Sequence, residues 1–107
     1  MFKVDVIYKI CSKFDWEKAL DAGVYKGSAD DERDGFIHFS AFDQVTETLD
    51  KHFKNQTRLL LLKVAIDRLD PTILKWEVSR NGEKFPHLYG DLELDAVVSI
   101  DELQGGN

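Results

Sequence analysis

The feature that most constrains the fold is an apolar segment in the middle of the chain, RLLLLKVAI at residues 58–66. A strand with one face in water alternates apolar and polar residues, whereas a strand covered on both faces is apolar almost throughout. The segment shows no alternation. It therefore predicts a β-strand at the centre of a sheet, with both of its faces covered.

Further strands and two short helices are predicted on either side of this segment. β-Branched and aromatic residues, with partial alternation, indicate strands at residues 4–10, 35–40, 73–79 and 96–100. Helical spacing of apolar residues indicates a helix within 14–23, with Asp15 as its cap and Gly23 as its stop, and a second helix at 42–53. Residues 24–35 are typical of a polar loop.

The segment at 73–79 alternates strictly, which predicts one buried face and one polar face. The apolar and polar sets are Leu74, Trp76 and Val78 against Lys75, Glu77 and Ser79. Together the elements predict a single α+β domain over residues 1–107, in which two or three short helices pack on a mostly antiparallel sheet. Residues 103–107 are expected to form a disordered tail.

Charge and composition restrict the function classes. The net charge is −6 and the pI is about 4.9, so we expect no bulk nucleic acid partner, although a small anionic ligand can still bind a local pocket. No long apolar segment is present, which argues against a membrane span and makes the cytoplasm the expected location. The single cysteine, Cys11, agrees with a reducing compartment. The oligomeric state is left open.

A few polar residues stand in or next to apolar strands at a spacing of two, so the members of each pair share a face. They are His38 with Ser40, Glu77 with Ser79, and His87 with Tyr89, and Arg80 directly follows the second pair. Such pairs on neighbouring strands can converge on one small-molecule cleft. The alternative is that they form the solvated face of an antiparallel sheet.

The sequence lacks the usual motifs of metal sites and of serine hydrolases. His38, His87 and one of Asp34, Glu77 or Asp91 would supply three metal ligands, but no H-x-H, H-E-x-x-H or C-x-x-C pattern is present. Ser40 follows a strand without the G-x-S-x-G turn that exposes a nucleophile. We predict no metal site, and keep a histidine and carboxylate metal enzyme as an alternative.

Several short motifs follow one another along the chain. They are IYKI at 7–10, Trp16, Gly23, Gly27-Ser28, Asp31, DGFIHFS at 34–40, Phe53, WEVSR at 76–80 and FPHLYG at 85–90. In their order and spacing they resemble, over nearly the whole chain, a bacterial family known as domain-of-unknown-function family 952. The family is distantly similar to the ADP-ribosyltransferase fold, in which a split antiparallel sheet holds nicotinamide adenine dinucleotide (NAD) in a cleft.

The resemblance implies roles for the polar pairs. A histidine on an early strand bonds the adenosine ribose in that superfamily, often with a serine nearby, and His38 with Ser40 resembles this element. An aromatic residue or a second histidine packs on the nicotinamide, as His87 or Tyr89 would here. The usual glutamate at the end of a late strand has no obvious counterpart, which leaves nucleotide binding open and puts transferase chemistry in doubt.

The leading hypothesis is a cleft that binds NAD or an ADP-ribose-like nucleotide and transfers or hydrolyses ADP-ribose. The expected catalytic residues are Glu77, which would steady an oxocarbenium ion, and His87. The expected ligand-binding residues are Tyr8, His38, Ser40, Ser79, Arg80 and Tyr89, with Arg80 neutralising phosphate. NAD would be a substrate, and no cofactor is firmly predicted. The alternative is a binding module without chemistry.

If His38 is a ligand-binding residue, His38→Ala is expected to abolish ligand binding without unfolding the domain. If it is instead a buried structural residue, the same change should lower the melting temperature by several degrees, because a buried hydrogen bond is lost. Ligand titration and thermal unfolding of the variant separate these outcomes.

Overall fold

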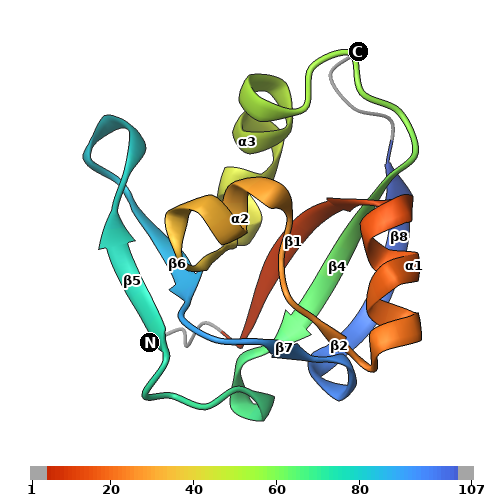
Figure 1. The fold of residues 1–107 in the computed structure, drawn as a ribbon. Coiled ribbons are helices and arrows are strands. Elements are labelled where there is room, and N and C mark those ends of the chain that lie inside the picture. Colours follow the sequence, from red (N-terminus) through yellow and green to blue (C-terminus); the bar gives the residue numbers. More distant parts are fainter. Residues whose placement is uncertain (1–4, 104–107) are drawn as a thin grey trace.

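The computed structural model describes residues 5–103, with all of their side chains except that of Arg80. The apolar segment forms strand β4 (Leu59–Ala65), which lies between β1 (Val6–Ser12) and β8 (Val97–Leu103). Both pairings are antiparallel. The predicted central position is therefore confirmed (Figure 1). The prediction that both faces are covered alike is wrong, because Leu61, Lys63 and Ala65 on one face are only half-buried.

Two smaller sheets complete the β-structure, and they too are antiparallel. One has the order β3 (Ile37–His38), β6 (Lys84–Leu88) and β5 (Leu74–Val78), and the other pairs β2 (Val24–Tyr25) with β7 (Leu92–Glu93). An isolated bridge between Tyr8 and Ser40 joins the two three-stranded sheets, with two N–H to C=O bonds of 2.8 Å. Around this bridge β1 and β3 are held side by side.

Three α-helices lie on the sheets: α1 (Lys13–Ala22), α2 (Ala29–Asp34) and α3 (Val45–His52). In Figure 1, α1 lies beside β4 and β8, α2 lies near the middle of the molecule, and α3 lies at one end. Four 3₁₀ turns span Phe42–Gln44, Ile66–Arg68, Arg80–Gly82 and Leu94–Ala96. The α+β class with few short helices is as predicted.

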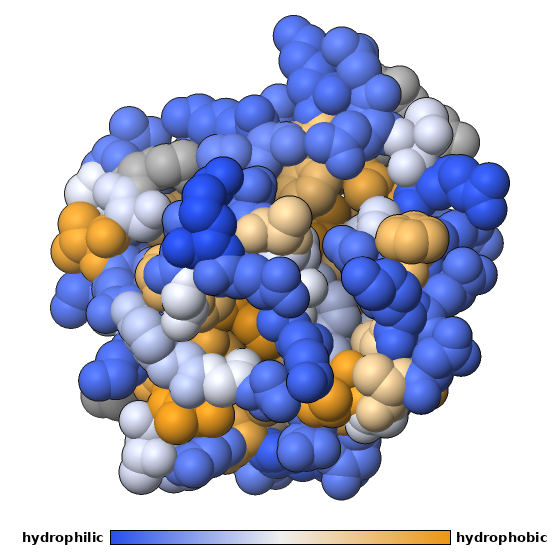
Figure 2. All heavy atoms as spheres, viewed as in Figure 1, coloured by the Kyte–Doolittle hydropathy of each residue, from blue (hydrophilic) through white to orange (hydrophobic). Residues whose placement is uncertain are grey.

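The core connects the sheets. Side chains with no exposed surface come from the first sheet, the second sheet and the β2–β7 pair: Ile7, Leu62, Val64, Leu88 and Leu92. The face shown in Figure 2 is mostly hydrophilic, and apolar side chains appear on it in separate small groups. No helix in residues 5–103 is long and apolar enough to cross a membrane.

The predicted loop at 24–35 is wrong, because part of it is helix α2. Ser28 Oγ accepts a bond from the Asp31 N–H at 3.2 Å, and Asp31 Oδ2 accepts one from the Ser28 N–H at 2.8 Å. This reciprocal capping satisfies two N–H groups at the helix start. Gly35, at φ 87°, ends the helix. The cap of α1 also differs: Ser12 Oγ accepts from the Asp15 N–H, so Asp15 lies in the first turn.

The predicted core face of residues 73–79 is also wrong. Val78 is 63% exposed and Trp76 is exposed, while Leu74 packs on the core and Glu77 is half-buried. The strand is at the edge of its sheet. Alternation shows which residues share a face, but the covering layer decides which face is buried.

Several other predicted elements differ from the structure at their ends. The predicted helix 42–53 begins with a 3₁₀ turn, and Phe42 is exposed rather than part of a buried stripe. The predicted helix stop at Gly23 is confirmed by its left-handed φ of 83°. Leu103 of the expected tail belongs to β8 and pairs with Leu59. Residues 104–107 lie outside the described residues, as does residue 4 of the predicted first strand.

Leu62→Ala tests the role of β4. Leu62 has no exposed surface, so truncation should lower the free energy of unfolding by about 2–5 kcal/mol through lost burial and a cavity. The measurement is urea unfolding. Leu20→Ala, on the exposed side of α1, is the control and should change stability by no more than about 0.5 kcal/mol. Equal losses in both variants would contradict a covered central strand.

Candidate functional site

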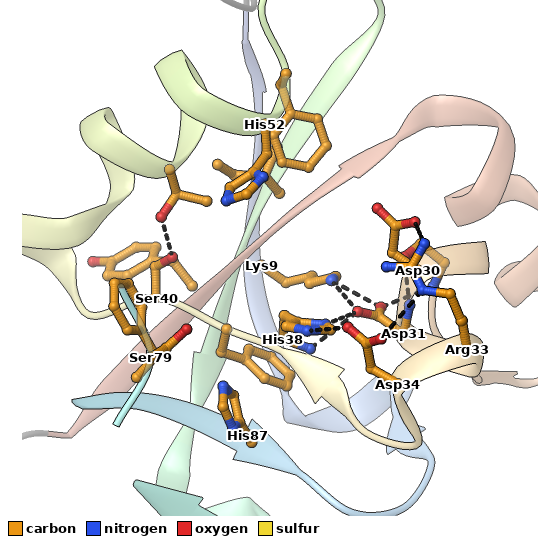
Figure 3. A pocket seen from close by; sticks show the side chains of 17 residues that line it. Lys9, Asp30, Asp31, Arg33, Asp34, His38, Ser40, His52, Ser79 and His87 are labelled. Atoms are coloured by element: carbon orange, nitrogen blue, oxygen red, sulfur yellow. Dashed lines mark hydrogen bonds and ion pairs between the residues drawn. The ribbon is translucent and has the colours of Figure 1, made fainter. Parts of the chain in front are cut away.

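A pocket with a volume of about 260 Å³ opens where β1 and the β3–β6–β5 sheet meet. Its walls come from β1, α2, residues 38–40, α3, Ser79 and β6. Figure 3 shows Asp30, Arg33 and Asp34 of α2 at one end and Ser40 and Ser79 toward the other. Lys9 and His38 lie between these ends, so the pocket has a charged end and a hydroxyl end.

A buried ion pair forms part of the wall between the two ends. Lys9 is 5% exposed and Asp31 is 2% exposed. The Lys9 ammonium lies 2.8 Å from Asp31 Oδ2 and 3.1 Å from Oδ1. A buried lysine needs such a partner, because an uncompensated charge in the interior is costly. The pair therefore ties α2 to β1.

Asp31 also holds His38. Its Oδ1 accepts bonds from the His38 backbone N–H at 3.1 Å and from ring Nδ1 at 2.6 Å. Burial alone would raise the pKa of Asp31, but the hydrogen bond from His38 and the charge of Lys9 outweigh it and hold this pKa well below its usual value. The carboxylate is therefore ionised, which places a proton on His38 Nδ1.

The second ring nitrogen of His38 faces another carboxylate. His38 Nε2 lies 3.0 Å from Asp34 Oδ2. Asp34 Oδ1 accepts from Arg33 Nε, and Arg33 also pairs with Asp30. The His38 ring therefore stands between two carboxylates of α2, those of Asp31 and Asp34.

His87 is the second histidine of the pocket, and a different carboxylate orients it. His87 Nδ1 lies 2.8 Å from Glu77 Oε1, which also accepts from the Tyr89 hydroxyl at 2.6 Å. These hydrogen bonds, that of Tyr89 first, lower the pKa of Glu77. The His87 ring stacks on Phe36 with 4.1 Å between centroids. His87 is thus buried and fixed on two sides.

Hydroxyl groups line the other end of the pocket. Ser40 is buried, and its Oγ lies 3.1 Å from Thr48 Oγ1 of α3. Ser79 and Tyr8 also line this end, and Ser79 is exposed. Hydroxyls donate and accept hydrogen bonds. This end can therefore bind a polyol without a net charge.

Comparisons with known proteins agree with this architecture. The family model described as "Protein of unknown function (DUF952)" matches residues 10–100. The chain belongs to the DUF952 family. A crystal structure of protein CC0527 from Caulobacter crescentus is similar to this DUF952 chain at 46% identity and a TM-score of 0.87, covering 92% of this chain and 85% of that one.

The solution NMR structure of CC0527 is also similar, at 45% identity and a TM-score of 0.81, covering 92% of this chain and 84% of the other. A crystal structure of a double mutant of CC0527 has 45% identity, a TM-score of 0.87 and coverage of 92% and 85%. A comparison with curated proteins gives no match. The solved relatives share the fold, and their descriptions state no activity.

The pocket of this DUF952 protein brings together five of the predicted residues: Tyr8, His38, Ser40, Ser79 and His87. Glu77 and Tyr89 are not among its described lining residues, but both lie next to His87, and the strand pairing puts Glu77 on the same sheet face as Phe85 and His87. Glu77 is therefore placed to orient His87. The side chain of Arg80 lies outside those described, so its phosphate role stays a prediction.

Sequence patterns did not identify Lys9, Asp31, Thr48 and His52 as pocket residues. A usable signal existed for Asp31, since the S-x-x-D spacing of a capping box is visible in the sequence. Lys9 carried a weaker signal, as a charged residue inside an otherwise apolar strand. Within residues 5–103, no group of three His, Cys, Asp or Glu side chains is arranged to hold a metal ion.

The contacts of His38 revise the expectation for its replacement. His38 lines the pocket and also donates to Asp31. We therefore expect His38→Ala to lower the melting temperature as well as ligand affinity. A variant for testing binding alone must come from a lining residue without a buried partner.

Asp31→Asn tests the buried ion pair. It leaves the Lys9 charge uncompensated, so we expect a loss of about 3–5 kcal/mol in the free energy of unfolding at pH 7. The folded-state pKa of Asp31 is depressed below the usual 3.8. In the unfolded chain Asp31 takes up a proton as the pH falls through about 4, while the folded carboxylate stays ionised, so this stabilisation declines with falling pH.

The measurement is denaturant unfolding of wild type and variant between pH 3 and pH 7. The difference between them should shrink below about pH 4. Asp30→Asn is the matched control, because Asp30 lies on the same helix with an exposed side chain. A difference that stays constant over the whole pH range would show that Asp31 does not carry this effect.

Proposed function

We propose that this DUF952 protein binds a ribose-containing nucleotide of the NAD or ADP-ribose type in the pocket. The observation that carries the proposal is the convergence of two carboxylate-held histidines and several hydroxyls on one pocket at the junction of two sheets. Convergent polar groups in a concave site are the usual mark of small-molecule binding.

The hydroxyl end suits a ribose. A ribose offers adjacent hydroxyls that donate and accept, and Ser40, Thr48 and Ser79 can do the same. The Phe85 ring lines the same pocket and offers an apolar surface to a sugar or base. A ribosyl group would thus find partners for its polar edge and its apolar face.

The charged end sets limits on the rest of the ligand. The charge of Lys9 is compensated by Asp31. Among the described side chains of this wall, the exposed Arg33 can turn toward a phosphate if it breaks its ion pairs with Asp30 and Asp34. Arg80 is a further predicted phosphate partner. The volume of about 260 Å³ is below the roughly 300–1,000 Å³ of most ligand pockets. One half of a dinucleotide would be enclosed, and the other half would lie outside.

Transfer or hydrolysis of ADP-ribose is the chemistry that the proposed likeness to the ADP-ribosyltransferase fold implies. The antiparallel sheets joined near Tyr8 and Ser40 support that likeness. The carboxylate predicted to steady a cationic transition state, Glu77, is bonded to His87 and is not among the described lining residues of the pocket. It would act by orienting the His87 ring, so His87 is the proposed catalytic residue.

A binding module without chemistry is the second candidate. The observation in its favour is that the described carboxylates of the pocket, Asp30, Asp31 and Asp34, are all paired with cations or with His38. Incubation of pure protein with NAD separates the candidates. Release of nicotinamide supports transfer or hydrolysis, and binding without turnover supports the module.

The proposal is tested by an amide NMR titration of labelled protein with NAD and, separately, with ADP-ribose. We expect shifts that cluster at residues 8–10, 38–40, 79 and 85–87. Ser79→Ala should weaken binding about 2- to 10-fold, the effect of one lost hydrogen bond. Ser99→Ala, an exposed serine on β8, is the control. Absence of shifts at millimolar ligand would reject nucleotide binding.

A further inference from the structure

Phe42 is the most exposed large apolar side chain in the described part of the chain. Its ring is 77% exposed, in the 3₁₀ turn that precedes α3. Single exposed apolar residues are common on protein surfaces and need no special explanation. The position of Phe42 matters because of what holds it and what it touches.

The turn that carries Phe42 is anchored to the protein. Gln44, which is buried, accepts a bond from the Ala41 N–H through Oε1 at 2.9 Å. Its amide Nε2 donates to the Lys84 carbonyl of β6, also at 2.9 Å. The two bonds fix the residues on both sides of Phe42, so the ring is presented to solvent from an ordered support.

Phe42 also continues the wall of the pocket. Its ring centroid lies 5.8 Å from that of Tyr8, at 57° between planes, within the usual range for aromatic pairs. Tyr8 lines the pocket. An aromatic surface therefore runs from inside the pocket, over Tyr8, to the exposed ring of Phe42.

We propose that Tyr8 and Phe42 form a second subsite, which stacks the base of the nucleotide half that remains outside the pocket. The inference rests on the proposed function and adds a ligand class: two ring systems joined by a flexible linker, as in a dinucleotide. A pocket of about 260 Å³ encloses one half of such a ligand. Stacking on aromatic side chains accepts any base, because every base has a π-face.

The experiment measures calorimetric affinities of wild type and Phe42→Ala for NAD and for its two halves, nicotinamide mononucleotide and AMP. The variant should bind NAD about 5- to 100-fold more weakly, the range found for loss of one base–aromatic stack. Affinity for the half that occupies the pocket should stay within about twofold. Because Phe42 is exposed, the melting temperature should not change.

Phe14→Ala is the matched control. Phe14 is 69% exposed on α1, a helix that contributes no described residue to the pocket lining. The Phe14→Ala variant should bind NAD and both of its halves with the affinities of wild type. The inference is overturned if Phe42→Ala binds NAD as wild type does, if it weakens NAD and both halves equally, or if Phe14→Ala loses as much. If wild type binds neither NAD nor ADP-ribose, the proposed function itself fails, and the subsite with it.

Discussion

The site depends on one buried carboxylate, that of Asp31. Within the part of the chain that the structure describes, it accepts bonds from the Ser28 N–H, the Lys9 ammonium, and the backbone N–H and ring of His38. These donors belong to the start of α2, to β1 and to β3, so a single side chain joins three elements. Burial of Asp31 is tolerated because every contact favours its charged form. Without it, α2 would lose its attachment and the pocket one of its walls.

The pocket itself results from the way the sheets are joined. β1 is fully paired with β4 on one side, while on the other its described partner is Ser40, through the bridge at Tyr8. Because, among the described residues, only this bridge joins the two sheets here, their strands need not stay adjacent beyond it. Side chains such as Lys9 and His87 can therefore face the same pocket.

The two histidines differ in a way that bears on function. His38 has both ring nitrogens against carboxylates of α2, whereas His87 has Nδ1 against Glu77 of β5. His38 is therefore suited to holding the wall, and His87 to meeting a ligand. Of the two proposed roles, binding of a ribosyl group fits this lining better than catalysis does, because hydroxyls and a fixed imidazole line the pocket, while the carboxylates of α2 are already paired. In the proposed second subsite, the half-buried Tyr8 and the exposed Phe42 would extend recognition beyond the enclosed volume.

The sequence by itself determined the local features: the central strand at 58–66, the helix stop at Gly23 and the motifs of the family. That His38, Ser40 and His87 line one pocket follows from the tertiary structure. Helix α2 was also readable from its capping box, a contact between residues three apart. Only the tertiary structure decided that Lys9 is buried against Asp31, that Glu77 bonds to His87, and that Trp76 and Val78 are exposed. The physical reason is that periodicity reports which side chains share a face, whereas burial and pairing depend on which distant segment covers that face.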